Sequence, residues 1–328
     1  KNVLLKKLLI MKSVNILLTC SSNKIHILDW IKKTSKKLNC KIKVIAGDSN
    51  YNVTSKYFCD IFWHMPKSNK KNYSKILNYC KKNNIKIIIP SSDKELIFWS
   101  TFKESLKRNK IYVMVSSKET VKTCLDKLNF YKNFKDLKSL VFTSQDLKDF
   151  KDNQKIIAKN RNGSGSNEII VNKIKSNVKK YLPNNSKNYI FQNYIRSDNE
   201  VSIDCYFSNK NKLLKLVPRN RTLVNSGESI ITTVIDDKYF FNEIKKLGYK
   251  LNFSGHVMFQ CFVNKKNIHI FECNPRIGGA SYMSFFNNMD SIYFFILENL
   301  FPKKVLKIKK NINIDSKLLI FKKTKFLR

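Results

Sequence analysis

The stretch FECNPRIGG, residues 271–279, places an acid, an amide and an arginine beside a proline and two glycines. The 328-residue chain is otherwise rich in lysine, asparagine and isoleucine, and has only eight glycines, six prolines and seven arginines. So many rare residue types in one short segment indicate a local constraint. One explanation is a tight turn. The other is a site in which Glu272 and Asn274 hold a metal ion and Arg276 meets a phosphate group.

An antiparallel hairpin that would complete this site is predicted by the overlapping sequence VMFQCFVNKKNIHIFECN. Side chains alternate between the two faces of a strand, so Ile270, Glu272 and Asn274 are expected on one face. With a loop at Lys265–Asn267, Gln260 lies directly across from Glu272. One carboxylate and two amides are hard oxygen donors, which suit Mg²⁺. A polar strip facing solvent on an edge hairpin is the alternative.

A second candidate element is the segment AKNRNGSGSNE, residues 158–168. Its glycines and serines follow Lys159 and Arg161, so backbone N–H groups could surround a phosphate with cations beside it. The Walker pattern G-x-x-x-x-G-K-[ST] is absent. A flexible hairpin turn is the alternative explanation.

A third candidate segment is PRNRTLVNSGES, which contains Arg219, Arg221 and Glu228. Together with Arg161 and Arg276, four of the seven arginines lie in the candidate segments. The lysines, in contrast, are scattered along the whole chain. The three segments together therefore favour a site that handles phosphate and magnesium.

The elements that must position these residues differ between the two halves of the chain. Up to residue 117, apolar runs alternate with amphipathic stretches, which predicts a parallel, Rossmann-like α/β domain. The predicted strands are residues 14–20, 41–48, 85–93 and 111–117, and the predicted helices are residues 24–38, 72–83 and 94–108. The sequence TCSSNK after the first strand has no glycine, so a dinucleotide bound in the usual way is not expected.

The second half predicts an α+β arrangement. One helix is expected over residues 118–134, followed by a strand, the Gly/Ser loop and a second strand within residues 154–171. Further strands are predicted at residues 189–195 and 200–208, helices near residues 237–249 and 290–300, and the hairpin between them.

The formal net charge of +39 does not by itself identify a nucleic-acid partner. The 63 basic residues are 56 lysines and seven arginines, and a nucleic-acid reader is expected to use arginine for bidentate contacts. Most of the charge is therefore interpreted as solvated surface, and no specific nucleic-acid partner is predicted. A polyanion-binding protein stays an alternative.

Cysteine usage and hydropathy indicate a cytoplasmic protein. The eight cysteines show no C-x-x-C spacing, as expected of free thiols in a reducing compartment, and the four histidines are dispersed. No apolar run reaches the roughly 18 residues of a membrane span, and Lys12, Ser13 and Asn15 interrupt the N-terminal one. We expect no membrane partner, and expect residues 1–10 to lie outside the folded domain.

In their order along the chain, these segments resemble the ATP-grasp superfamily, most closely the branch similar to the large chain of carbamoyl-phosphate synthetase. The resemblance is carried by IIPSSDKEL (88–96), CLDKLNF (124–130), IAKNRNGSGS (157–166), FQNYIRSDNEVSIDC (191–205), SGES (226–229) and FQCFV…IFECNPRIGG (259–279). It implies a pre-ATP-grasp domain over residues 11–117 and a two-lobed ATP-grasp domain, with lobes at residues 118–190 and 191–328.

The resemblance also implies residue roles. Lys127 and Lys159 match the positions that contact ATP phosphates, and Gly163, Ser164, Gly165 and Ser166 match the lid over them. Gln192, Asn193 and Ile195 match the hinge that reads adenine, and Glu200 matches an acid near the ribose. Gln260, Glu272 and Asn274 match the ligands of Mg²⁺, with Mn²⁺ as an alternative ion, and Arg276 matches the arginine facing the transferred phosphate. Asn193 and Ser197 depart from the glutamate and glycine that are frequent in relatives.

The implied activity is that of a Mg-ATP-dependent carboxylate–amine ligase that forms an acyl phosphate. Arg219 and Arg221 are predicted to hold that phosphate or the substrate carboxylate, because arginine binds both bidentately. The partners are a small carboxylate, an amine or similar nucleophile, and a second copy of the chain in a homodimer. A degenerate ATP-grasp module that binds nucleotide without turnover is the main alternative.

Overall fold

A computed structural model describes residues 13–163, 169–183, 186–197, 199–304 and 308–320. The predicted extension, residues 1–10, and the loop residues Ser164, Gly165 and Ser166 lie outside these ranges. The chain divides into two units, one of Lys1–Val115 with Ser291–Leu306 and the other of Ser116–Asp290 with Lys307–Arg328.

The first unit contains the predicted parallel sheet, with strand order β3-β2-β1-β4-β5. The strands are β1 (Ser13–Thr19), β2 (Lys41–Asp48), β3 (Ile61–His64), β4 (Ile85–Pro90) and β5 (Tyr112–Val113). Apolar residues of β1, β2 and β4 are buried, as expected for strands covered on both faces. The strand β3 was not predicted, because IFWH is too short to show a period. The last strand, β5, is much shorter than expected.

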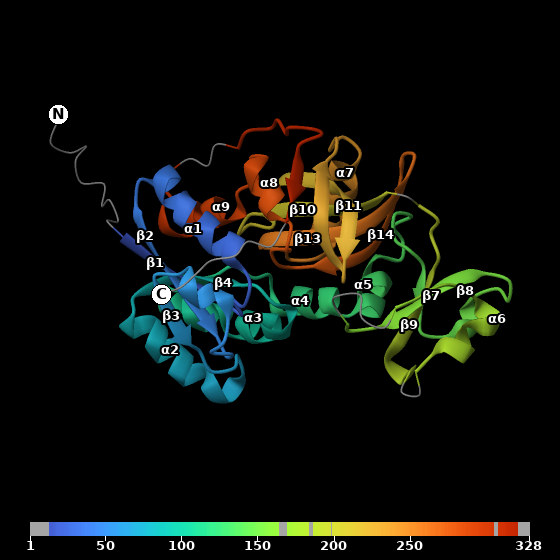
Figure 1. Cartoon of the computed structure of the whole chain (residues 1–328), viewed down its shortest axis with the longest axis horizontal. Helices are drawn as coiled ribbons and strands as arrows, with labels where there is room; N and C mark the ends of the chain where they lie inside the picture. Colours follow the sequence, from blue (N-terminus) through green and yellow to red (C-terminus); the bar gives the residue numbers. More distant parts are fainter. Residues whose placement is uncertain (1–12, 164–168, 184–185, 198, 305–307, 321–328) are drawn as a thin grey trace. The chain divides into compact units, whose positions relative to one another are not determined.

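Helices of the first unit agree with the predicted periodicity. They are α1 (Ile25–Leu38), α2 (Tyr73–Lys82), α3 (Asp93–Arg108) and α9 (Ser291–Leu300). Helix α9 contacts α1, far from it in sequence (Figure 1). The sequence prediction had placed residues 291–300 in the second lobe. They group with the first unit, where this largely apolar segment buries Ile292, Phe295 and Ile296.

The turn after β1 is held by an acid at the end of β2. The carboxylate of Asp48 accepts hydrogen bonds from the backbone N–H of Ser22 at 2.8 Å and from its hydroxyl at 3.1 Å. A dinucleotide phosphate would need such backbone donors for itself. The negative charge of Asp48 beside this turn therefore disfavours phosphate binding there, in line with the missing glycines.

The second unit has two sheets that are antiparallel within their named strands. The larger has the order β14-β13-β10-β11-β12-β15 and the smaller β6-β9-β7-β8. The larger consists of β10 (Glu200–Phe207), β11 (Leu213–Asn225), β12 (Glu228–Val234), β13 (Gly255–Asn264), β14 (Asn267–Asn274) and β15 (Lys317–Leu319). The smaller consists of β6 (Thr143–Ser144), β7 (Lys155–Asn160), β8 (Ile170–Ile174) and β9 (Tyr189–Asn193). The α+β prediction for this half is confirmed, although the hairpin β11–β12 was not foreseen.

One apolar core covers one face of the larger sheet. The helices of this unit include α4 (Lys118–Leu125), α5 (Lys127–Phe134), α6 (Lys175–Val178), α7 (Phe240–Lys250) and α8 (Tyr282–Phe286). Side chains of α4, α5 and α7 share a core with Ile203, Cys205 and Phe259 of the sheet. The opposite face carries the alternate residues of the same strands, among them the polar side chains of Asp204, Arg219 and Gln260.

The predicted single helix over residues 118–134 is wrong in one respect, because it is broken at Asp126. This residue has extended backbone angles (φ −108°, ψ 101°) and its side chain caps α5 by accepting from the Asn129 N–H at 3.0 Å. An aspartate at an N-cap replaces a missing intrahelical partner. The break makes Lys127 the first residue of α5.

Gly248 of α7 is expected to tolerate no side chain. A Cβ there would lie 2.8 Å from Cε1 of Phe207 in β10, and both positions are buried. Gly248→Ala should lower the free energy of unfolding by about 1–3 kcal/mol through overpacking. Urea unfolding measures this. Asn242→Ala on the exposed side of α7 is the matched control and should stay within about 0.5 kcal/mol; equal stability of both variants would contradict the packing.

Candidate active site

The hairpin β13–β14 brings the three predicted metal ligands together. Gln260 pairs with Glu272, as predicted, and the Asn274 amide donates to Gln260 Oε1 at 3.1 Å. The route to this pairing differs from the prediction. The loop is shorter by one residue, because Asn264 pairs with Asn267, and the register shifts between Gln260 and Cys261. This β-bulge restores the predicted partner.

The bulge also corrects which residues share a face. Ile270 was expected beside Glu272, yet it is fully buried in the apolar core with Cys273. With one extra residue in β14, Phe271 and Glu272 both escape that core. The ring of Phe271 stacks on Phe262 of β13, with centroids 4.8 Å apart. The site face of the hairpin therefore carries an aromatic pair beside the oxygen donors.

Two lysines from other elements approach this hairpin. Nζ of Lys127 lies 3.9 Å from Glu272 Oε1 and donates to the carbonyl of Gly163. Nζ of Lys159, on β7, lies 4.9 Å from the ring centroid of Phe271. Burial lowers the pKa of Lys159 to about 8, although the charge of Glu272 acts in the opposite direction. Residues that are far apart in sequence thus form one charged cluster.

Arg161 does not extend this cluster. It was expected beside a phosphate, but its guanidinium makes two hydrogen bonds with the carboxylate of Asp126, at 2.7 and 2.6 Å. This bidentate contact occupies the Nε and Nη2 donors, which a phosphate group would otherwise bind.

Arg219 likewise has a partner of its own. It is 1% exposed, and its Nε donates to Asp204 Oδ2 at 2.8 Å. The carboxylate of Asp204 also contacts His256 Nε2 at 3.2 Å and accepts from the hydroxyls of Ser281 and Ser284, both at 2.6 Å. Burial raises the pKa of Asp204, but the charge of Arg219 outweighs it and the pKa lies far below its ordinary value. This placement indicates a structural ion pair, which counts against the predicted substrate contact of Arg219.

Arg221 and Glu200 form a second pair on the same sheet. Arg221 Nε lies 3.3 Å from Glu200 Oε1, and its Nη2 donates to the carbonyl of Gly227 at 2.8 Å. Burial raises the pKa of Glu200, while the charge of Arg221 lowers it. Glu272 and Lys159 also act electrostatically on Glu200, so the pair lies within reach of the charged cluster.

The turn after Asn274 explains one of the two glycines of the opening motif, Gly278. Arg276 is half-buried and its Nη1 donates to the Ile277 carbonyl at 3.2 Å. The N–H of Gly278 donates to Ser281 Oγ at 2.8 Å, and a Cβ at Gly278 would lie 2.6 Å from Met258 Sδ. A side chain at this position would thus collide with the sheet beneath it.

The predicted hinge residues lie on β9 and just after it. Gln192 is buried and its amide donates to Thr143 Oγ1 at 2.8 Å, so its side chain serves the sheet. The backbone N–H of Asn193 and that of Tyr194 are donated to the carbonyls of Phe142 and Lys155. These two N–H groups are therefore used within the protein, and the adenine contact of Ile195 stays a prediction.

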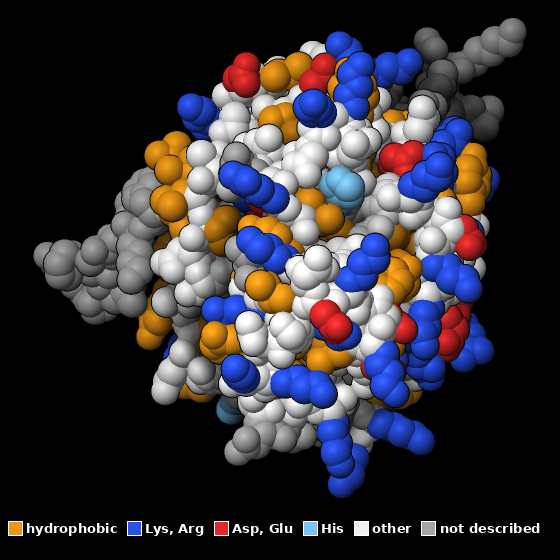
Figure 2. All heavy atoms as spheres, turned by 90° about the vertical axis from the view of Figure 1, so that its right-hand side faces the viewer, with side chains coloured by type: hydrophobic (Ala, Val, Ile, Leu, Met, Phe, Trp, Pro, Cys, Tyr) orange, Lys and Arg blue, Asp and Glu red, His pale blue; other side chains and the backbone are white. Residues whose placement is uncertain are grey.

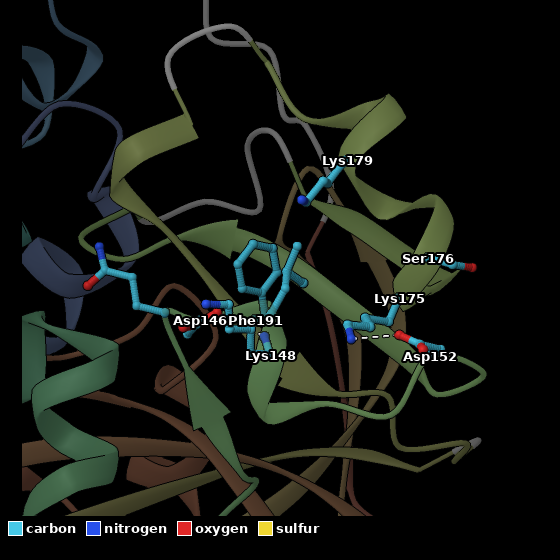
Figure 3. Close-up of a pocket in the computed structure, with 9 residues that line it drawn as sticks. Asp146, Lys148, Asp152, Lys175, Ser176, Lys179 and Phe191 are labelled. Carbon is cyan, nitrogen blue, oxygen red and sulfur yellow. Dashed lines mark hydrogen bonds and ion pairs between the residues drawn. The ribbon is translucent and has the colours of Figure 1, made fainter.

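A cavity of about 500 Å³ lies beside the smaller sheet (Figure 3). Its lining is Gln145, Asp146, Leu147, Lys148, Asp152, Lys175, Ser176, Lys179 and Phe191. Phe191 belongs to the same apolar cluster as Ile156 and Ala158, whereas Lys159 points to the opposite face of β7. The cavity is therefore separate from the charged cluster.

The predicted metal ligands do not form a conventional cluster of acidic, histidine or cysteine side chains. Across the described ranges, no group of three or more His, Cys, Asp and Glu side chains could hold a metal ion. The predicted ligand set has one carboxylate and two amides, and thus differs in kind from such a group. Its oxygen donors fit a hard cation that keeps other ligands from phosphate and water.

Two family models match the sequence. Residues 16–114 match the N-terminal domain of PylC-like proteins, and residues 185–317 match the ATP-grasp domain of the biosynthetic pathway with the Ter operon. No curated protein matches the sequence significantly.

Solved structures with the same architecture cover most of the chain. The biotin carboxylase domain of Hydrogenobacter thermophilus 2-oxoglutarate carboxylase has a TM-score of 0.68 at 13% identity, over 92% of this chain and 73% of its own. The N5-carboxyaminoimidazole synthetase of Staphylococcus aureus has a TM-score of 0.66 at 15% identity, over 92% and 80%. Biotin carboxylase of Campylobacter jejuni has a TM-score of 0.68 at 14% identity, over 94% and 74%.

These matches define the class of protein. A parallel-sheet unit followed by two antiparallel sheets is the ATP-grasp architecture of these neighbours. Residues 185–317 match an ATP-grasp family model, and the chain as a whole has the ATP-grasp fold of these neighbours. Its place in the carbamoyl-phosphate-synthetase-like branch stays a prediction.

Asp204→Asn is expected to destabilise the protein strongly. The amide leaves Arg219 buried without its counter-charge, which costs about 3–5 kcal/mol. The pKa of Asp204 is lowered, so the wild type carries this stabilisation above the ordinary carboxyl pKa and loses it as the pH falls toward the lowered value. Urea unfolding between pH 3 and pH 7 measures both effects.

The matched control for this substitution is Asp136→Asn. Asp136 lies 3.4 Å from Lys250 in an exposed pair, so its loss should cost less than about 1 kcal/mol. An Asp204→Asn variant as stable as Asp136→Asn at neutral pH would contradict the structural role of the buried pair.

Proposed function

We propose that the chain uses Mg-ATP to activate a small carboxylate as an acyl phosphate, which an amine or similar nucleophile then attacks. The observation that carries this proposal is the approach of Lys127 to Glu272, with Nζ and Oε1 3.9 Å apart and Lys159 beside them. One lysine would be enough to neutralise the carboxylate of Glu272 alone. Two converging lysines and two amides instead suit a polyphosphate with its metal ion.

The proposed nucleotide contacts come from helix α5, from both sheets and from the loops beside them. Lys127 and Lys159 would neutralise phosphate oxygens, and Gly163 lies at the start of the loop predicted to cover them. Ile195 would meet the adenine edge, and Glu200 the ribose. The neighbours support this assignment, since the Hydrogenobacter structure contains MgADP and the Staphylococcus enzyme has also been crystallised with ADP.

Glu272, Asn274 and Gln260 would hold Mg²⁺, which would neutralise charge on the phosphates when bound. Before the metal binds, Glu272 is opposed by Lys127, so its charge is not left unpaired in a partly buried position. The stacked rings of Phe271 and Phe262 would shield one side of the cluster from water when a ligand is bound. Exclusion of water strengthens the electrostatic interactions inside the site.

The proposed reaction needs positioning more than a protein nucleophile. An oxygen of the substrate carboxylate attacks the γ-phosphorus, and the bond to the ADP oxygen breaks with its electron pair. The amine nitrogen then attacks the acyl carbon, phosphate leaves, and the nitrogen gives a proton to water. Arg276 would stabilise the transferred phosphoryl group, and Arg221 the carboxylate. Arg219 is not included, because Asp204 holds it.

A degenerate nucleotide-binding module is the second candidate, because Asn193 and Ser197 depart from the relatives. The side chain of Asn193 accepts from the Gln154 amide at 2.7 Å, so it is engaged within the sheet. The hydroxyl of Ser197 donates to the Val263 carbonyl at 3.0 Å and supports the turn before β10. Both contacts stabilise the hinge, which favours a functional site over a degenerate one.

Polyanion binding has less support. Figure 2 shows lysine and arginine side chains spread over one face, with acidic and apolar groups between them, rather than gathered in a single patch. None of the helices in the described ranges has the length and apolar character to cross a bilayer.

A homodimer stays a prediction; the Hydrogenobacter biotin carboxylase domain was crystallised as a dimer.

The nucleotide site is tested by thermal denaturation with ATP, with and without Mg²⁺. Wild type should be stabilised by roughly 2.7 kcal/mol at a hundredfold excess of ligand over Kd. Glu272→Gln should lose the part of this shift that depends on Mg²⁺. Glu119→Gln, at an exposed pair with Lys122, is the matched control and should behave as wild type. A wild type without any shift would refute nucleotide binding.

Acyl phosphate formation is tested with hydroxylamine, which traps such intermediates as hydroxamates. A panel of carboxylates, including bicarbonate through its ADP release, is incubated with enzyme and Mg-ATP. We expect ADP release that depends on one class of acid, and at least a tenfold lower rate for Arg221→Ala, about 1.4 kcal/mol of lost transition-state binding. Arg108→Ala is the control. Nucleotide binding without ADP release for any acid would favour the degenerate module.

A further inference from the structure

We propose that Asp126 and Arg161 are positioning residues for Lys127, so that the salt-bridged pair sets the phosphate affinity of a site it does not touch. This inference rests on the proposed nucleotide site. Neither Asp126 nor Arg161 is among the proposed metal ligands or phosphate contacts.

The side-chain part of this arrangement is a two-point contact. Arg161 Nε donates to Asp126 Oδ1 at 2.7 Å and Nη2 donates to Oδ2 at 2.6 Å. Oδ1 also accepts from the backbone N–H of Asn129 at 3.0 Å. A bidentate fork fixes orientation as well as distance. Burial raises the pKa of Asp126, but the hydrogen bonds from Arg161 and Asn129 outweigh it and lower the pKa below its ordinary value.

The backbone of Arg161 makes two further contacts. Its N–H donates to the Asn188 carbonyl at 2.8 Å, just before β9, and its carbonyl accepts from the Lys127 N–H at 3.2 Å. One residue at the end of β7 thus connects the smaller sheet with the start of α5. Lys127 follows Asp126 directly, so its backbone is held through its own N–H and through the preceding side chain.

This attachment fixes the origin of the Lys127 side chain. The helix breaks at Asp126 and α5 begins at Lys127, whose Nζ approaches Glu272 and donates to the Gly163 carbonyl. Without the fork, the helix end could fray and the ammonium group would lose its fixed distance to Glu272. Long-range placement of a flexible lysine depends on such a rigid base.

A structural explanation of the pair makes a different prediction. A clamp that only stabilises the fold would lower the melting temperature and weaken every ligand alike. A positioning pair would weaken phosphate-bearing ligands and leave adenosine unaffected. The effect of Arg161 would also vanish once Lys127 is removed, since coupled residues are not additive.

The experiment measures Kd for Mg-ATP and for adenosine by isothermal titration calorimetry. The proteins are the wild type, Arg161→Ala, Asp126→Asn, Lys127→Ala and the double variant Lys127→Ala/Arg161→Ala. Arg108→Ala is the control for loss of an exposed arginine from α3. We expect both single variants of the pair to bind Mg-ATP about tenfold more weakly, with unchanged Kd for adenosine. The double variant should bind Mg-ATP as Lys127→Ala does.

Three results would overturn the inference. The first is an Arg161→Ala variant that binds Mg-ATP as tightly as wild type. The second is a double variant whose loss of Mg-ATP affinity equals the sum of the losses of the two single variants. The third is a Kd for adenosine that rises in parallel with the Kd for Mg-ATP. Circular dichroism and urea unfolding without ligand show whether each variant is folded at the assay temperature. If Arg161→Ala does not fold, Arg161→Lys, which keeps the charge without the fork, is used in its place. A wild type that does not bind Mg-ATP would refute the proposed function and this inference together.

Discussion

The polar face of the larger sheet depends on one buried carboxylate. Asp204 is fully buried, and an unpaired charge there would cost several kcal/mol. Arg219, His256, Ser281 and Ser284 satisfy it together. Arg219 and His256 come from β11 and β13, the strands on either side of β10, and the two serines come from the segment after residues 271–279. One ion therefore holds that segment against the sheet, and with it the turn from Asn274 to Gly278.

The position of the site residues depends on this buried carboxylate and on two irregularities in the backbone, one in the edge strand β14 and one between α4 and α5. The bulge in β14 moves Phe271 and Glu272 away from the apolar core, and the break at Asp126 directs Lys127 toward them. Neither feature contributes a reacting group. Each sets the position of a charged side chain, Glu272 or Lys127. Accurate placement of charges is the main requirement when catalysis depends on position and electrostatics.

Much of the architecture could be predicted because it is local. Buried strands such as β2 and β4 are continuous apolar runs, and α1 shows its period, so the alternation of the first half was evident. The pairing of Gln260 with Glu272 was also predictable, although a two-residue loop and a bulge produce it. The hairpin β11–β12 was missed because its exposed half lacks alternation, and α9 was misplaced because an apolar helix does not reveal its neighbour.

The sequence by itself determined which residue types are available: an acid and two amides within one hairpin, two lysines, and a few arginines in otherwise arginine-poor surroundings. Only the tertiary structure decided which partner each of them has. In sequence the arginines of the candidate segments looked equivalent, yet Arg161 and Arg219 each make a short side-chain ion pair with an aspartate, Asp126 or Asp204. Arg221 instead lies 3.3 Å from Glu200 of the site face. The reason is physical: a charge removed from water takes the nearest opposite charge, and the nearest charge in space is not written in the order of the chain.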